Sequence, residues 1–300
     1  YEFPNMNFSL QVGNFKEPFG LEELNSSRLL TMMERSGISK AIPLGRRIGL
    51  AARYWTDWGQ ATVGIFGHET GTRVDKGTGD EGYSTNLRLS VAPINEQGKN
   101  LHFGVAASYK RPDVVSDLSL NTIEIKTRNE SYVSDIKFLH TGDITDVNYY
   151  NRYSAEFMGV YGSFYLQAEY IGTNIVRWYG KPSANLGGGY ATLSWMVSGE
   201  SRKYYVDEGE IGPIDSPKNS WGAFELALRY SITDLNDLTA GIKGGKANIL
   251  TMGVNYYPNV NIKIMLNYAM ANFDEFATGK GKYLGNDDHS FLQCRIQASL

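Results

Sequence analysis

The chain has 300 residues, a formal net charge of −3 and 42% hydrophobic residues. Mean hydropathy is −0.34, and no stretch approaches the roughly 18 consecutive apolar residues of a transmembrane helix, so a helical membrane protein is excluded. The charge gives no sign of nucleic-acid binding, and the single cysteine, Cys294, excludes an internal disulfide. The 33 glycines and 20 tyrosines are typical of many strands, tight turns and interfacial aromatic residues.

Alternation of apolar and polar residues predicts strands along most of the chain. Most are 8 to 13 residues long, close to the ~9–11 residues with which a tilted strand crosses a membrane, whereas soluble strands are usually ~5–6 residues. We predict strands at 6–13, 46–56, 60–68, 83–93, 99–110, 118–127, 150–161, 163–175, 188–199, 219–231, 246–258, 260–272 and 289–300, with a weaker one at 131–139.

Residues 14–45 interrupt this pattern. Pro18 cannot lie in a central strand, and the spacing of Leu21, Leu24, Leu29 and Met32 is closer to helical than to extended. Ser26 or Ser27 is a candidate cap of a short helix through Met33. If the predicted strands close into a wide β-barrel, we expect this long loop to fold inward and narrow the pore of the barrel. The alternative is an external loop packed against its neighbours.

The connections between strands fall into two classes. Short ones include 56–59, 161–163 and 258–259, and long polar ones include 69–82, 176–187, 232–245 and 273–288. This asymmetry is typical of outer-membrane barrels. Counting back from the last strand places residues 200–218 at the end of the barrel where the connections are short. This connection is too long for that end, so it contains either a missed strand or a segment that folds into the pore mouth.

The last two predicted strands alternate most clearly. Val260, Ile262, Ile264, Leu266, Tyr268 and Met270 share one face, and Leu292, Cys294, Ile296, Ala298 and Leu300 share another. Such faces require lipid on one side and water on the other. We therefore predict an all-β fold: one transmembrane antiparallel β-barrel domain over 1–300, with about 16 strands in the intact protein. The N-terminal strands are expected to lie outside this chain, and the location is the outer membrane of a Gram-negative bacterium.

The segment Phe15-Lys-Glu-Pro-Phe-Gly-Leu-Glu-Glu-Leu24, with Met33-Glu-Arg35 and Gly45-Arg-Arg-Ile-Gly49, resembles the phosphate-selective porin O/P family. Further similarity lies in Phe164-Tyr-Leu-Gln-Ala-Glu-Tyr170 and Trp221-Gly-Ala-Phe-Glu-Leu-Ala-Leu-Arg-Tyr230. The resemblance runs from about residue 6 to the C-terminus. It implies a 16-stranded homotrimeric porin whose third external loop lines the constriction. Phosphate as the solute is favoured mainly by this resemblance.

Sorting the charges by face gives a basic lumen inside an acidic chain. The predicted lumen faces carry eight cations (Arg47, Arg53, Arg88, Lys110, Arg152, Arg229, Lys263 and Arg295) against Glu156, Glu169 and Glu225. Basic pore walls suit anions, and the arginine fork suits phosphate. The six candidates for the anion path are Lys16, Arg28, Arg35, Arg47, Arg53 and Arg88. The alternative is that these arginines pair with carboxylates and only make the wall rigid.

Other functions have weaker support in the sequence. The four histidines are scattered and belong to no catalytic motif, no metal-ligand spacing is present, and we expect neither enzyme activity nor a cofactor. The acidic segment 75–81 lacks the EF-hand pattern, which favours a solvated loop over a calcium site. The predicted function is passive diffusion of small anions such as phosphate. A general porin of weak selectivity and a scaffold barrel for an envelope complex remain alternatives.

Overall fold

A computed structural model describes residues 1–3, 5–67, 82–112, 121–133 and 135–299. Twelve strands form one antiparallel sheet in which each strand pairs with the next one of the set along the chain. The strands are β1 (Phe8–Lys16), β2 (Arg46–Thr56), β3 (Gly59–Phe66), β4 (Ser84–Glu96), β5 (Lys99–Lys110), β8 (Val147–Tyr161), β9 (Phe164–Arg177), β10 (Ala184–Met196), β13 (Ala223–Asp237), β14 (Ile242–Asn259), β15 (Ile262–Phe273) and β16 (His289–Ala298).

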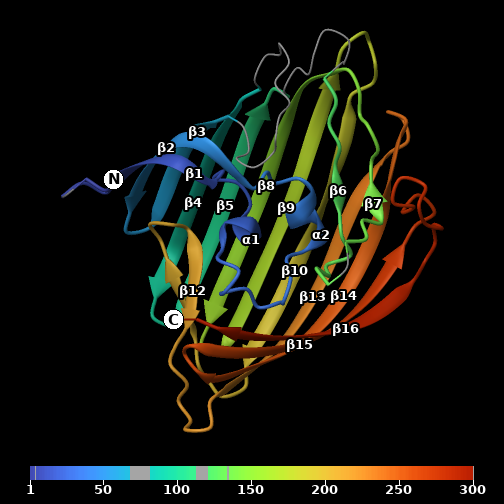
Figure 1. The fold of residues 1–300 in the computed structure, drawn as a ribbon. Helices are drawn as coiled ribbons and strands as arrows, with labels where there is room; N and C mark the ends of the chain where they lie inside the picture. The colour runs from blue at the N-terminus through green and yellow to red at the C-terminus, as the bar shows by residue number, and fades with distance from the viewer. Residues whose placement is uncertain (4, 68–81, 113–120, 134, 300) are drawn as a thin grey trace.

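The sheet curves into a shell with a concave inner side (Figure 1). β1 and β16 are its two edges, and no pairing joins these two strands among the described residues. The antiparallel all-β fold predicted from the sequence is confirmed. The figure of about 16 strands concerns the intact barrel and stays a prediction.

Two of the predicted strands do not cross the sheet. In place of 118–127 and 131–139 the described residues form only the short pair β6 (Lys126–Thr127) and β7 (Leu139–His140), which lies on the concave side. Ile125 and Leu139 pack in an apolar cluster with lumen-facing residues of β8, β13, β14 and β15. Alternation correctly indicates two unlike faces here, but the apolar face meets protein and not lipid.

Several connections are shorter than expected because the strands extend further. The predicted loops 176–187 and 232–245 reduce to 178–183 and 238–241, whereas 274–288 is long as expected. The predicted loop 69–82 lies almost wholly outside the described residues. The short turns gather at one end of the sheet and the long loops at the other, which we call the short-turn end and the long-loop end.

The predicted faces are confirmed on the last two strands. Ile262, Leu266 and Tyr268 are exposed on the convex side of β15, whereas Lys263 and Asn267 are buried on the concave side. On β16, Leu292, Cys294 and Ile296 are exposed in the same way. Leu300 lies outside the described residues.

Exposed aromatic side chains gather near both ends of the strands. At the short-turn end they are Trp58, Tyr161, Phe164, Trp195, Trp221 and Phe224, and near the long-loop end Tyr83, Trp178 and Tyr179. Aromatic girdles of this kind mark the two interfaces of a membrane barrel. Among the described residues, no helix is long and apolar enough to cross a membrane.

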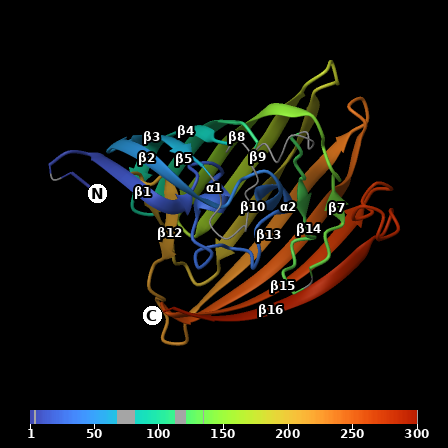
Figure 2. The same cartoon turned by 45° about the horizontal axis from the view of Figure 1, so that its top comes forward.

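Three inserts occupy the concave side of the sheet (Figure 2). The constriction loop, 17–45, contains α1 (Leu21–Leu24) and α2 (Gly37–Ala41). The outer insert, 121–146, carries β6 and β7, and also comes from the long-loop end. The third, which we call the hairpin, is formed by β11 (Arg202–Tyr205) and β12 (Glu210–Ile214) and comes from the short-turn end.

Candidate functional site

The constriction loop begins at a buried ion pair. β1 ends at Lys16, and the next residue, Glu17, places its carboxylate 2.6 Å from Nη2 of Arg152 on β8. The same carboxylate accepts a hydrogen bond from Ser84 Oγ at 2.6 Å. Both charged groups are fully buried, and a buried carboxylate of this kind requires such partners. The start of the loop is therefore fixed to the wall.

The first turn of the loop is held by a wall carboxylate. Glu169 of β9 accepts hydrogen bonds from the backbone N–H groups of Leu21, at 2.9 Å, and Glu22, at 3.3 Å. The Glu22 side chain in turn accepts from the N–H and hydroxyl of Ser36, the residue that caps α2. The predicted helix from Ser26 or Ser27 through Met33 is wrong, because residues 25–36 contain no helix. Wall contacts replace helical hydrogen bonds in this stretch.

The second half of the loop is attached to the later strands. Asn255 of β14 donates to Thr31 O at 2.8 Å, and Arg295 of β16 donates to Met33 O at 2.6 Å. Arg295 also pairs with Glu34. Lys263 of β15 donates to Leu30 O. The loop thus crosses the concave side from β1 toward β16, which confirms that it folds inward.

The hairpin reaches the loop from the opposite end. Arg202 donates to Leu29 O at 3.2 Å and to Thr31 Oγ1 at 2.9 Å, and the N–H of Ile211 donates to Asn25 Oδ1 at 3.2 Å. This contact answers the question left open by the sequence: residues 202–214 enter the lumen. The hairpin and the constriction loop together set the free space inside the shell.

Arg88 fixes the tip of the hairpin. Its guanidinium pairs with Glu156 at 2.7 Å and donates to the carbonyl oxygens of Glu208, at 3.0 Å, and Gly209, at 2.7 Å. Gly209 has φ +63°, and a Cβ there would lie 2.5 Å from Ser90 Oγ. Only glycine fits this turn without strain. The tip is therefore wedged against β4.

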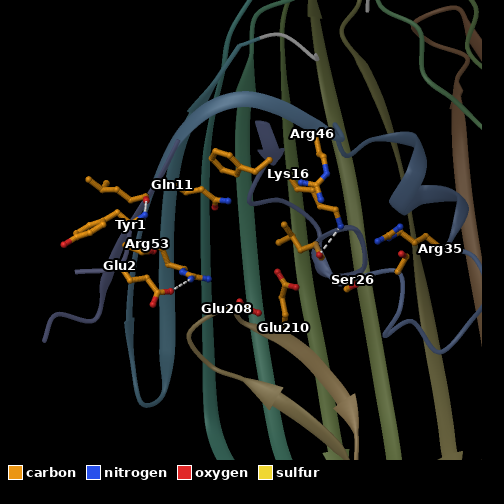
Figure 3. Close-up of a pocket in the computed structure, with 15 residues that line it drawn as sticks. Tyr1, Glu2, Gln11, Lys16, Ser26, Arg35, Arg46, Arg53, Glu208 and Glu210 are labelled. Atoms are coloured by element: carbon orange, nitrogen blue, oxygen red, sulfur yellow. Dashed lines mark hydrogen bonds and ion pairs between the residues drawn. The ribbon is translucent and has the colours of Figure 1, made fainter. Parts of the chain in front are cut away.

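A cavity of about 710 Å³ lies between β1, β2, the constriction loop and the hairpin tip (Figure 3). Four cations line it: Lys16, Arg35, Arg46 and Arg53. Three carboxylates, Glu2, Glu208 and Glu210, line it as well. Arg53 lies 3.9 Å from Glu2, and Arg35 lies 3.3 Å from Glu23. Within the described part of the chain, neither Lys16 nor Arg46 forms an ion pair with a carboxylate.

The predicted path residues do not all occupy this cavity. Lys16, Arg35 and Arg53 line it, whereas Arg28 is exposed and lines a second cavity of about 570 Å³ beside β15 and β16. Arg47 lies 3.9 Å from Glu17. Arg88, only 2% exposed, borders a smaller pocket below the first cavity.

Of the predicted cations that line the main cavity, Lys16 differs from Arg35 and Arg53 in having no ion pair with a described carboxylate. Its ammonium donates only to backbone carbonyl oxygens of the constriction loop, those of Glu23, Leu24 and Asn25. Three further wall arginines of the sequence prediction, Arg152, Arg229 and Arg295, pair with carboxylates of the inserts. Much of the basic wall therefore positions the inserts.

Sequence reasoning missed three residues of the cavity. Arg46 is not among the six candidates for the anion path, although its side chain turns toward Lys16 (Figure 3). Glu208 and Glu210 were not named as site residues either. The abnormal length of 200–218 was the only signal that this segment had a role inside the barrel.

The described residues contain no group of three or more side chains suited to a metal ion. His102 is buried, with Nδ1 2.7 Å from Tyr204 Oη and Nε2 3.4 Å from Glu156. His68 and the acidic segment 75–81 lie outside the described residues. The main arrangement is a polar cavity lined by four cations and three carboxylates.

A sequence profile described as phosphate-selective porin O and P matches residues 1–297. The chain belongs to this porin family. It is 25% identical to Porin O of Pseudomonas aeruginosa over 96% of its own length and 70% of that protein. It is also 26% identical to an uncharacterized protein of Caulobacter vibrioides, over 87% of this chain and 53% of that one. As a porin O and P member, the chain is an outer-membrane porin.

Proposed function

We propose that this porin passes small anions, phosphate and related oxyanions first, by diffusion through the cavity lined by Lys16, Arg35, Arg46 and Arg53. Arg28 extends the path into the second cavity. Arg47, which lies 3.9 Å from Glu17 and lines neither cavity, adds positive charge near the start of the constriction loop. Arg88 acts by holding the hairpin. The cations attract and transiently hydrogen-bond the solute, and no covalent step is involved.

One observation carries the proposal: Lys16 and Arg46 line the cavity without a carboxylate partner among the described residues. A cation in a cavity whose charge is not neutralised by a neighbouring carboxylate raises the local concentration of anions. Family membership supports phosphate in particular, since the family is described as phosphate-selective.

The test is a planar-bilayer recording of purified channels under a KCl gradient, followed by titration of the chloride current with phosphate. Wild-type channels should show an anion-selective reversal potential and block by phosphate. In the double variant Lys16→Gln, Arg46→Gln, phosphate block should weaken about tenfold or more, since each charged hydrogen bond contributes about 1.5–3 kcal/mol. The matched control, Lys99→Gln with Lys243→Gln, removes two positive charges from outside both cavities.

Other results select the alternatives. Conducting channels with little selectivity indicate a general diffusion porin whose basic residues are neutralised by partners. Verified, intact barrels without conductance indicate the structural barrel that anchors an envelope complex. An equal loss of phosphate block in the control variant would contradict the assignment of the path to this cavity.

The family resemblance also supports a homotrimer, with outer-membrane lipid around the exposed convex face. Chemical cross-linking in native membranes tests this assembly: a ladder that ends at the trimer is expected, and a monomer band alone at saturating reagent contradicts it.

A further inference from the structure

Two carboxylates lie where the two cavities meet. Glu208 and Glu210, together with Ser26, line both the 710 Å³ cavity and the 570 Å³ cavity. Glu208 lies in the turn of the hairpin, Glu210 begins β12, and Ser26 belongs to the constriction loop. In Figure 3, Glu208 and Glu210 lie between Arg53 and Ser26. A solute that passes from one cavity to the other therefore moves beside both carboxylates.

These two carboxyl groups have no cationic side chain as an ion-pair partner among the described residues. Neither forms an ion pair with any described residue, in contrast to Glu17, Glu156 and Glu225, which are each paired with an arginine. Glu208 is exposed and Glu210 is half-buried.

The backbone that carries the two glutamates is held firmly on both sides. Arg88 binds the carbonyl oxygens of Glu208 and Gly209, and Asn25 binds the N–H of Ile211. Tyr205 pairs with Glu210 in the hairpin ladder. The distance between the carboxylates and the passage is thus set by the fold and not by a freely moving loop.

We propose that Glu208 and Glu210 act as specificity-determining residues that favour singly charged over doubly charged anions. The inference rests on the proposed function, anion diffusion through these cavities. The cations of the first cavity attract all anions, and the two carboxylates then oppose their exit. Because electrostatic energy is proportional to the charge of the solute, a divalent anion meets about twice the barrier of a monovalent one.

The experiment compares chloride and sulfate, which remain monovalent and divalent across the working pH range. Reversal potentials are recorded with KCl on one side of the bilayer and K₂SO₄ on the other, at about pH 8.5, where free carboxyl groups are ionised. In Glu208→Gln, Glu210→Gln channels, the chloride-to-sulfate permeability ratio should fall at least about threefold relative to wild type. The matched control is Asp207→Asn, which removes a neighbouring charge that lines neither cavity.

Each outcome decides a separate point. A fall in the ratio in the double variant, with Asp207→Asn unchanged, supports the proposal. An unchanged ratio in double-variant channels that still conduct overturns it. The KCl-gradient measurement on wild type is independent of the two glutamates: loss of anion preference there overturns the proposed function itself. If the double variant does not insert, Glu208→Gln alone, at the more exposed position, gives the same reading with a smaller expected change.

Discussion

Arginine has two distinct roles in this porin, and its surroundings decide which. Arg88, Arg152 and Arg229 are almost completely buried, and each forms an ion pair with a carboxylate. A buried charge without such a partner would destabilise the fold by several kcal/mol, on the order of the cost of breaking a buried pair. Arg46 is exposed at the cavity and needs no partner. The residue type alone does not distinguish an anchoring arginine from one that attracts solute.

The pKa of a single residue, Glu210, predicts that the conductance of the channel depends on pH. The hairpin lies inside the lumen and does not cross the bilayer. Burial raises the pKa of Glu210 to about 7. The neighbouring carboxylates of Glu208 and Glu156 also raise this pKa, whereas the cations Arg88 and Lys16 lower it. The carboxyl group is therefore neutral below this pH and charged above it. Chloride conductance should rise about twofold as the pH falls through 7.

The measurement is single-channel current in KCl at stepped pH. In Glu210→Gln channels the step near pH 7 should disappear, because no group titrates at that position. A step of equal size in wild type and in this variant would assign the titration to another residue.

At the scale of elements, the constriction loop has little stability of its own. α1 has four residues and α2 has five, well below the ~12–15 residues at which an isolated helix becomes marginally stable. The loop keeps its shape through wall residues that are distant in sequence, such as Arg152, Glu169 and Arg295. The lumen wall and the loop therefore behave as one unit.

Removing one side of the Glu17–Arg152 pair should loosen this unit. Glu17→Met leaves Arg152 buried without its carboxylate, which we expect to lower the free energy of unfolding by about 3 kcal/mol. Channels that still form should be noisier and wider, because the start of the loop is no longer fixed. The measurements are urea unfolding in detergent and open-channel current noise.

The matched control is the double variant Glu17→Met, Arg152→Met, which removes both members of the fully buried pair. Stability should largely return, because replacing both members of a buried pair is often close to neutral. Arg152 also lies 5.0 Å from the ring centre of Phe19, a contact that methionine preserves in part through its sulfur. If the double variant is less stable than the single one, the ion pair is not what fixes the loop.

At the scale of the whole molecule, the curved sheet separates two environments. Its convex side is apolar and bounded by exposed aromatic residues at both ends of the strands. Its concave side holds three inserts that enter from opposite ends (Figures 1 and 2). The larger of the two cavities described above lies next to β1, β2 and the hairpin tip, so the path that we propose for the solute runs beside the early strands.

The single cysteine tests which side faces lipid. Cys294 is exposed on the convex side of β16. In liposomes a water-soluble maleimide should label it very slowly, because the reactive thiolate does not form in hydrocarbon. Labelling should be complete after unfolding in denaturant. A cysteine placed at exposed Lys99 in a Cys294→Ser background supplies the accessible control, and rapid labelling of Cys294 in sealed liposomes would contradict the membrane orientation.

The positions of the twelve strands of the sheet, and the face on which their side chains lie, were determined by the sequence itself. Side chains of a strand alternate between two faces whatever its neighbours are, so the local pattern is sufficient to place Leu266 outward and Lys263 inward. The inward folding of the loop predicted at 14–45 and the unusual length of 200–218 could also be predicted, because both segments break that pattern.

Tertiary structure alone decided which charges are paired and where the passage lies. Arg152 and Glu17 are 135 residues apart, Arg88 and the Glu208 carbonyl 120, and Arg295 and Glu34 261. No local pattern encodes contacts between segments so distant in the chain. For the same reason, alternation could not tell that residues near Ile125 pack on the lumen wall and not against lipid. Which charges form ion pairs and which side chains meet solvent is decided by the assembled shell. These two properties distinguish Arg88, which holds the hairpin, from Arg46, which faces the cavity.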